Sequence, residues 1–261
     1  MLQEDRFLKI LEYISDKNTA TFSQLKDVLG VSEGTVRRDL SKMEKSGMLK
    51  IVRGGVVSVK DDLSKQAFKM RSIEHREEKR NLAGALREII VDGQAIAMNG
   101  GTTHIETAKY LAKNYTRLTI ITNNLNAVET LKENKGFTVI ITGGIHDPKE
   151  NVLFGKQCIN AILSYNVDIA LLAVNAISLK NGITDFRLEE ISILNAFMKS
   201  SRMSVVVADH SKFDRVACMN VCEIGAIDCI VTDGNITPNL LETYRAAGVR
   251  IITPTDKQGM K

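Results

Sequence analysis

The feature that most constrains this 261-residue sequence is a series of seven short apolar runs in its last two thirds. The runs are rich in Val, Ile, Leu and Ala, and segments with helical patterns separate most of them. Strands that are buried on both faces have this nearly continuous apolar character. The series therefore predicts an α/β domain with a mostly parallel sheet covered by helices. The runs are 94–98, 118–122, 138–142, 167–174, 204–208, 229–232 and 250–253.

The first 59 residues follow a different pattern. Apolar residues three and four apart predict a first helix over 3–15, and Ser23 is a candidate cap for a second short helix that ends at Gly30. A third helix begins after Ser32, and two β-prone runs over 48–59, divided by two glycines, predict a hairpin. This order of elements is typical of a winged helix-turn-helix DNA-binding domain.

The third helix places its polar residues away from its apolar stripe. Arginine forks and hydroxyls on such a face can reach base edges or phosphates in the major groove. The alternative interpretation is a solvated helix face, on which Arg37 and Arg38 pair with neighbours such as Glu33 or Ser41. We expect contacts to double-stranded operator DNA from Ser32, Thr35, Arg37, Arg38, Ser41, Lys42 and Arg53.

The charge distribution agrees with a DNA-binding front. Residues 1–80 contain 17 Lys and Arg against 13 Asp and Glu, whereas the remaining residues contain 18 of each. The whole excess of positive charge therefore lies at the front, where contacts to a phosphate backbone would need it. Residues 60–72 are polar without a clean period and predict a linker, and a helix over about 73–91 opens the second domain, 73–261.

Polar residues follow several of the predicted strands. In open parallel sheets, the ligand crevice lies beyond the carboxyl ends of the strands. Glycines followed by threonines at a helix start allow backbone N–H groups to approach an anion, and Lys212 could add a point charge. Asn, Thr and Asp side chains suit sugar hydroxyls. We expect a phosphorylated sugar to bind Asn99, Gly100, Gly101, Thr102, Thr103, Asn123, Asn124, Gly143, Gly144, Asn175, Asp185 and Lys212.

Each of these residues also has an ordinary structural interpretation. Glycine and threonine commonly build turns and caps, so the GGTT segment at 100–103 is a weak signal by itself. Asp209 could simply cap or satisfy a loop, this is the role expected for His210, and Lys212 could simply be solvated. Several strands in one half of the predicted sheet end in polar residues, and this number favours a ligand crevice over isolated turns and caps.

These motifs together resemble the DeoR family of bacterial transcription regulators. The resemblance rests on Arg6, Ile10 and Ile14, then SEGTVRRDL at 32–40, the turn at Gly47 and the wing at 52–55. It continues through nearly the whole chain, with EKR at 78–80, GGTT, TNN at 122–124, GG at 143–144, NGIT at 181–184 and DHSKF at 209–213.

The resemblance implies a fold like ribose-5-phosphate isomerase and the CoA-transferase-like proteins, with a phosphorylated sugar or related metabolite as inducer. It implies that Gly101, Thr102 and Thr103 bind phosphate, that Asn123 lines the crevice and that Lys212 assists. The chain departs from the family pattern at Val56, Asn99, Asn175, Ala176 and Asp214.

Two functions were compared on this basis. The leading hypothesis is a metabolite-responsive repressor that works as a dimer or tetramer, because single DNA-binding heads bind too weakly to be selective. The alternative is a sugar-phosphate isomerase with a DNA-binding appendage. Related isomerases have a glycine-rich lysine loop where this chain offers only LKNG at 179–182, although Asp185, Glu189 and Glu190 remain as possible bases. We therefore expect no catalytic residues.

Other classes of protein are disfavoured by composition. The four cysteines (158, 218, 222 and 229) form no CxxC pair, which favours buried reduced thiols over a metal site, and we expect no cofactor. No apolar run approaches the ~18 residues that cross a bilayer, and charge begins at the fourth residue. We expect a cytoplasmic protein with no membrane partner.

Overall fold

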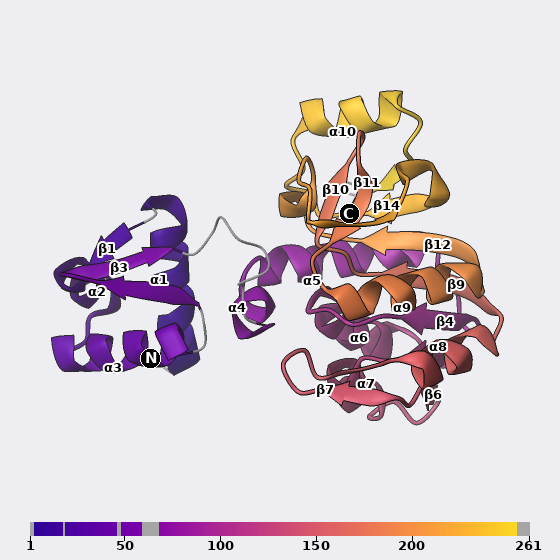
Figure 1. Cartoon of the computed structure of the whole chain (residues 1–261), viewed down its shortest axis with the longest axis horizontal. Coiled ribbons are helices and arrows are strands. Elements are labelled where there is room, and N and C mark those ends of the chain that lie inside the picture. The colour runs from indigo at the N-terminus through magenta and orange to yellow at the C-terminus, as the bar shows by residue number, and fades with distance from the viewer. Residues whose placement is uncertain (1–2, 18, 46–47, 59–67, 255–261) are drawn as a thin grey trace, which may run out of the picture. The chain divides into compact units, whose positions relative to one another are not determined.

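The computed structural model describes residues 3–17, 19–45, 48–58 and 68–254 (Figure 1). The chain divides into two compact units, Met1–His75 and Arg76–Lys261, called here the N-terminal and C-terminal units. Each has its own hydrophobic core. Among the described residues, no helix has the length and apolar character needed to cross a membrane.

The N-terminal unit is the winged helix-turn-helix that the sequence predicts. Three helices are followed by a hairpin, and a short strand before the second helix completes an antiparallel sheet in the order β1-β3-β2. Its elements are α1 (Gln3–Lys17), β1 (Thr19–Thr21), α2 (Phe22–Leu29), α3 (Glu33–Lys45), β2 (Leu49–Val52), β3 (Gly55–Ser58) and α4 (Phe68–Ile73).

The predicted apolar stripes form the core of this unit. Ile10, Leu25, Val36, Leu40 and Met43 are almost completely buried in one cluster. Burying each such side chain contributes about 1.5–3 kcal/mol. The three helices are therefore held together by the residues whose spacing predicted them.

The start of α2 differs from the expectation. Thr21, and not Ser23, is its N-cap: the Thr21 hydroxyl accepts from the Gln24 N–H, and the Gln24 side chain accepts from the Thr21 N–H. This capping box satisfies two helix-end donors at once, so it is favoured over the single bond that Ser23 could make. The helix ends at Gly30 in a left-handed conformation, as predicted (φ 63°).

Part of the predicted linker is helical. Within 60–72, residues 60–67 lie outside the described residues, but the following residues form α4, and Met70 is buried in the core of the N-terminal unit. The helix predicted over about 73–91 is shorter, since α5 spans Arg76–Ala85 and a 3-10 turn, η2, follows at Leu86–Glu88.

The C-terminal unit contains the predicted parallel sheet. All seven apolar runs form strands, in the order β15-β14-β12-β9-β4-β5-β6, and every pairing between neighbours is parallel. The predicted fold class is confirmed. The strands are β4 (Ala95–Met98), β5 (Thr119–Thr122), β6 (Thr138–Ile141), β9 (Val167–Leu172), β12 (Ser201–Val207), β14 (Cys229–Val231) and β15 (Ile251–Ile252).

Helices cover both faces of this sheet. Because side chains alternate along a strand, Ile96 and Met98 pack into one cluster and Ala97 into the other. The first cluster includes residues of α5, α6 (Thr103–Asn114) and α7 (Leu125–Leu131), and the second includes residues of α8 (Lys156–Leu163), α9 (Leu188–Lys199) and α10 (Pro238–Ala246). The segments that connect the strands to the helices begin at the carboxyl ends of the strands.

Several short elements were not predicted. They are three or four residues long and lie in the connections after the strands, where periodicity is too brief to read. They form the hairpin β7 (Ile145–Asp147) with β8 (Val152–Phe154), the antiparallel sheet of β10 (Ala176–Ser178), β11 (Gly182–Asp185) and β13 (Met219–Cys222), and the 3-10 turns η3 (His210–Lys212) and η4 (Ile224–Ala226).

Candidate functional site

The recognition helix α3 begins with a local hydrogen-bond pair. The Ser32 hydroxyl accepts from the Thr35 N–H at 3.2 Å and lies 2.9 Å from the Thr35 hydroxyl. Ser32 therefore caps the helix, which is the role that serine commonly has at this position. The two residues lie together at the start of α3, as the predicted reading surface requires.

Arg37 and Arg38 both contact their own helix. Arg37 donates to Glu33 at 2.8 and 3.0 Å, and its guanidinium lies 4.2 Å from the centre of the Phe22 ring. Arg38 donates to the Gly34 carbonyl at 3.2 Å. Both arginines are exposed, and an exposed ion pair contributes only about 0–1 kcal/mol. In the free protein, Arg37 and Arg38 therefore have the solvated arrangement. The contacts that hold them there are weak enough for contacts to DNA to replace.

An ion pair that the sequence did not predict fastens α3 to α1. Arg6 donates to both oxygens of Asp39, at 2.6 and 3.1 Å, and Gln3 donates to Asp39 at 2.9 Å. Burial favours the neutral form of Asp39, but the hydrogen bonds from Arg6 and Gln3 outweigh it and hold the pKa of Asp39 below its usual value. Residues of both helices line a 370 Å³ hollow: Gln3, Arg6, Thr35, Arg38, Asp39, Ser41 and Lys42.

The predicted DNA-contacting residues are therefore partly gathered. Thr35, Arg38, Ser41 and Lys42 line one hollow, and the Lys42 amine lies 3.4 Å from Gln3. Arg53 is exposed in the turn between β2 and β3, on the wing. The helix and the wing are the two elements with which a winged helix reaches DNA.

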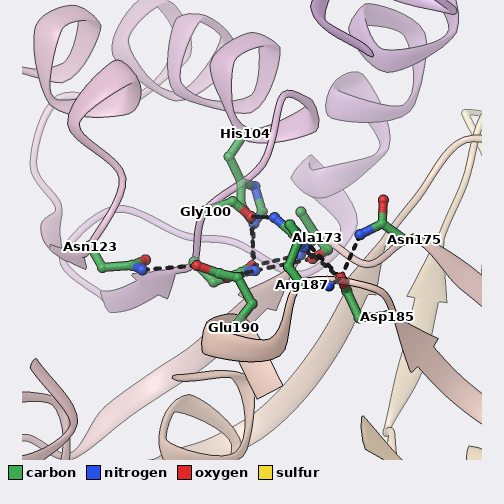
Figure 2. Close-up of polar contacts among 9 residues, drawn as sticks. Gly100, His104, Asn123, Ala173, Asn175, Asp185, Arg187 and Glu190 are labelled. Carbon is green, nitrogen blue, oxygen red and sulfur yellow. Dashed lines mark hydrogen bonds and ion pairs between the residues drawn. The ribbon is translucent and has the colours of Figure 1, made fainter. Parts of the chain in front are cut away.

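In the C-terminal unit, the residues after β4, β5 and β9 meet in a buried polar cluster (Figure 2). Asn99 is its centre: its amide nitrogen donates to the Ala173 carbonyl at 3.0 Å and to Glu190 at 2.9 Å, and its oxygen accepts from the Ala173 N–H at 2.7 Å. His104 Nε2 lies 3.2 Å from the same oxygen. Asn99 thus joins β4, β9 and the first turn of α9.

The two asparagines after β5 have separate roles. Asn123 donates to the Leu153 carbonyl at 2.8 Å and to Glu190 at 3.2 Å. Asn124 caps α7 with its side-chain oxygen and donates to the Gly101 carbonyl at 3.2 Å. Asn124 therefore fixes the loop after β4, whereas Asn123 reaches α9.

An internal ion pair closes the other side of the cluster. Arg187 donates to both oxygens of Asp185, at 3.0 and 2.8 Å, and to the carbonyls of Gly100 and Ala173. Asn175 donates to the same carboxylate at 2.7 Å. Burial opposes the charge on Asp185, but the adjacent guanidinium holds the pKa of Asp185 below its usual value. Two predicted residues, Asn175 and Asp185, thus bond each other directly, and Arg187, which was not predicted, pairs with the Asp185 carboxylate.

The GGTT loop lies directly against this cluster. A Cβ at Gly100 would lie 2.8 Å from a Glu190 oxygen, and Gly101 has a left-handed backbone (φ 144°), so both positions require glycine. Thr102 is the N-cap residue of α6 and makes no side-chain cap hydrogen bond. The first N–H groups of this helix are therefore not capped by the Thr102 side chain, at the end where the helix dipole favours an anion.

The structure does not bring all predicted residues to the cluster. Gly143 and Gly144 lie in an exposed turn between β6 and β7, and Lys212 is half-buried in η3, after β12. In the described part of the chain, no hydrogen bond or ion pair joins these three residues to the cluster. His210 has the loop role that was expected, since both its N–H and its ring nitrogen contact Asp233.

Sequence reasoning missed Arg187 and His104 and treated Glu190 only as a possible base. Each of them makes at least one contact to a residue distant in the chain, such as Leu171 for His104 and Gly100 for Arg187. For Arg187 and Glu190, the sequence signal is the run of charged residues just after Asp185.

Among the described residues, no group of three or more His, Cys, Asp or Glu side chains could hold a metal ion.

A winged helix-turn-helix, followed by a parallel α/β unit with a polar cluster at its strand ends, defines a regulator that couples DNA to a small ligand. Residues 6–62 match the family model described as the DeoR-like helix-turn-helix domain, and residues 74–234 match the DeoR C-terminal sensor domain. The chain belongs to the DeoR family of transcription regulators.

Two relatives that match most of the chain are named as a transcriptional regulator and a repressor. The chain is 30% identical over 251 residues to the HTH-type transcriptional regulator GolR of Listeria innocua, covering 96% of this chain and 98% of that protein. It is 28% identical over 233 residues to the glycerol-3-phosphate regulon repressor of Escherichia coli, covering 89% and 92%. It is also similar to ribose 5-phosphate isomerase A of Methanocaldococcus jannaschii, with 14% identity and a TM-score of 0.40 over 54% of this chain and 55% of that chain.

Proposed function

We propose that this protein represses a sugar-metabolism operon and that a phosphorylated sugar releases it from the operator. The observation that carries the proposal is the N-terminus of α6, which Thr102 does not cap, beside a buried polar cluster at the strand ends, in a chain that begins with a DNA-binding unit. The helix end suits a phosphate, and the amides and carboxylates suit hydroxyl groups.

In this proposal, the phosphate lies at Gly101, Thr102 and Thr103, and Lys212 approaches it from the segment after β12. DNA is contacted by Ser32, Thr35, Arg37, Arg38, Ser41, Lys42 and Arg53. The working protein is a homo-oligomer, a dimer or a tetramer, because two heads bound to two half-sites supply the selectivity that one head lacks. Its place is the cytoplasm, where promoter DNA is available to it.

The effector acts by preferring one conformation. A ligand shifts an equilibrium only by the difference in its affinity for the two states. The sugar phosphate therefore binds more tightly to a state in which the heads do not match the half-sites. Linkage requires that operator DNA weakens effector binding by the same factor.

The experiment that tests this is a titration by fluorescence anisotropy. The full chain is bound to labelled DNA from upstream of its own operon, and individual sugar phosphates are then added. We expect at least one of them to release the DNA, whereas the corresponding unphosphorylated sugar does not. If no DNA from this region binds in preference to unrelated DNA, the proposal is wrong.

The proposal also states that the chain is a regulator without enzymatic turnover. It is supported by the names of the relatives, which are regulators and repressors. Pure protein incubated with pentose and hexose phosphates should leave them unchanged when the mixture is followed by NMR. Sustained aldose–ketose conversion would favour the isomerase alternative.

A further inference from the structure

Glu190 is a buried carboxylate that forms no direct ion pair among the described residues. Its exposed fraction is 2%, and its two oxygens accept from the amides of Asn99 and Asn123. The charge of Arg187 attracts that of Glu190, but the guanidinium makes its direct ion pair with Asp185. Burying a charge is costly unless hydrogen bonds compensate, so this arrangement requires a further explanation.

The surroundings of Glu190 contain more acceptors than donors. The oxygen of the Asn123 amide, whose nitrogen donates to Glu190, is buried without a hydrogen-bond partner among the described residues. His104 Nε2 faces two acceptors, the Asn99 side-chain oxygen and the Leu171 carbonyl, so Nε2 carries the ring hydrogen. The other ring nitrogen, Nδ1, is then an acceptor, and it is buried without a hydrogen-bond partner among the described residues. Burial lowers the pKa of His104 to about 3, which keeps the ring neutral.

A donor-rich ligand would complete this cluster. A carboxylate can accept about four hydrogen bonds and Glu190 receives two, while the Asn123 oxygen receives none. Figure 2 shows Glu190 between Asn123 on one side and the Arg187–Asp185 pair on the other. The Gly100 backbone is close enough that a Cβ there would meet the Glu190 carboxylate.

We infer that Glu190 and Asn123 bind the hydroxyl groups of the effector and so determine which phosphorylated compound the protein senses. This inference rests on the proposed function, because it assigns the α6 N-terminus to the phosphate. The effector is then a polyhydroxylated phosphate ester, with at least two hydroxyl groups directed at the Glu190 carboxylate and the Asn123 oxygen.

The inference also describes a change of shape. Glu190 and Arg187 are both buried in this conformation. Arg187 is the N-cap residue of α9, and Glu190 lies in the first turn of this helix. A ligand reaches the carboxylate only when this segment moves away from the loop after β4. Effector binding is thereby coupled to the position of α9.

The test compares affinities of the full chain for matched ligands by isothermal titration calorimetry. The probes are ribose 5-phosphate, fructose 6-phosphate, glucose 6-phosphate, and ethyl phosphate as an ester without hydroxyl groups. We expect the best sugar phosphate to bind about tenfold or more tightly than ethyl phosphate, because hydrogen bonds to a charged group are among the strong ones. Glu190→Gln should remove most of that ratio by weakening the binding of the sugar phosphate.

The neighbouring residue supplies the matched control. Glu189 is exposed on the same helix turn, so Glu189→Gln should keep the full ratio. A Glu190→Gln variant with the wild-type ratio would overturn the inference. If this variant does not fold, as judged by its thermal transition and operator binding, the wild-type ratio decides: equal affinities for ethyl phosphate and for the best sugar phosphate also overturn it. If no phosphate ester binds at all, the proposed function itself fails.

Discussion

Arg37 is held in the free protein by weak contacts. It bonds Glu33 and packs on Phe22, on the exposed face of α3. Under the proposed function, DNA would offer it guanine acceptors or a phosphate, to which a guanidinium can donate two hydrogen bonds at once.

Replacing Arg37 should therefore affect binding and leave the fold intact. We expect Arg37→Ala to weaken operator binding by about 1–3 kcal/mol, measured by gel shift or anisotropy. Lys132→Ala is the control, because Lys132 forms a similar exposed intrahelical ion pair with Glu129 in the C-terminal unit. An unchanged affinity for Arg37→Ala would remove this side chain from the reading surface.

The lowered pKa of Asp39 leads to a prediction about how stability depends on pH. Its pKa is depressed in the folded chain, so its contribution to the free energy of unfolding is present above its unfolded pKa of about 4 and is lost as pH falls through the folded value. Asp39→Asn should destabilise the N-terminal unit by about 1–3 kcal/mol at pH 7. The measurement is hydrogen exchange of the α3 amides.

The difference between wild type and Asp39→Asn should shrink towards pH 3, and exchange in the C-terminal unit should not respond to the substitution. A difference that is equally large at pH 3 and pH 7 would show that the charge on Asp39 is not the cause.

At the same scale, the limit of sequence reasoning is clear. Asn99, Asn123 and Asn175 could be predicted because each follows a predicted strand, and the edge of a parallel sheet brings such positions together. Asp185 was predicted from its place further along the segment that follows the fourth apolar run. Arg187 and Glu190 could not be predicted, because their roles come from partners in other segments. Lys212 followed the same rule as the asparagines, and its role stays a prediction.

Among the secondary-structure elements, strands with a nearly continuous apolar sequence could be predicted, and strands of mixed polarity in the connections could not. The seven buried strands could be recognised because both faces of the sheet demand apolar residues. The strands β7, β8, β10 and β11 are only three or four residues long, and their pairing is decided by neighbours in space. The cap of α2 was misplaced by two residues because a capping box depends on a reciprocal bond that the pattern alone does not show.

Gly84 in helix α5 allows a test of how backbone entropy affects the stability of the C-terminal unit. Gly84 lies inside this helix, and a Cβ there would meet no atom within 4 Å. Gly84→Ala should therefore raise the free energy of unfolding of the C-terminal unit by about 0.5–1 kcal/mol in a denaturant titration.

Gly55 provides the opposite case. A Cβ at this residue would collide with the Ala20 backbone across the β1–β3 pair, so Gly55→Ala should destabilise the N-terminal unit. Equal effects of the two substitutions would contradict this account of the glycines.

At the scale of the molecule, charge and function are divided along the chain. The positive excess lies in the first 80 residues, and the balance beyond them is neutral. DNA affinity should therefore fall steeply with salt, by about 10³–10⁵ between 50 and 200 mM for six to ten phosphate contacts. The measurement is the operator dissociation constant of the full chain across this range, and a flat response would exclude phosphate contacts as the main source of affinity.

The separate cores of the two units have a consequence for how such regulators diversify. No buried apolar residue of the described N-terminal cluster belongs to either cluster of the C-terminal unit. Changes that retune metabolite preference therefore do not disturb the packing that presents α3. A chimaera that carries this recognition module on a relative's sensor should keep its operator while answering to a different nutrient, which makes the chain a source of exchangeable parts for engineered genetic circuits.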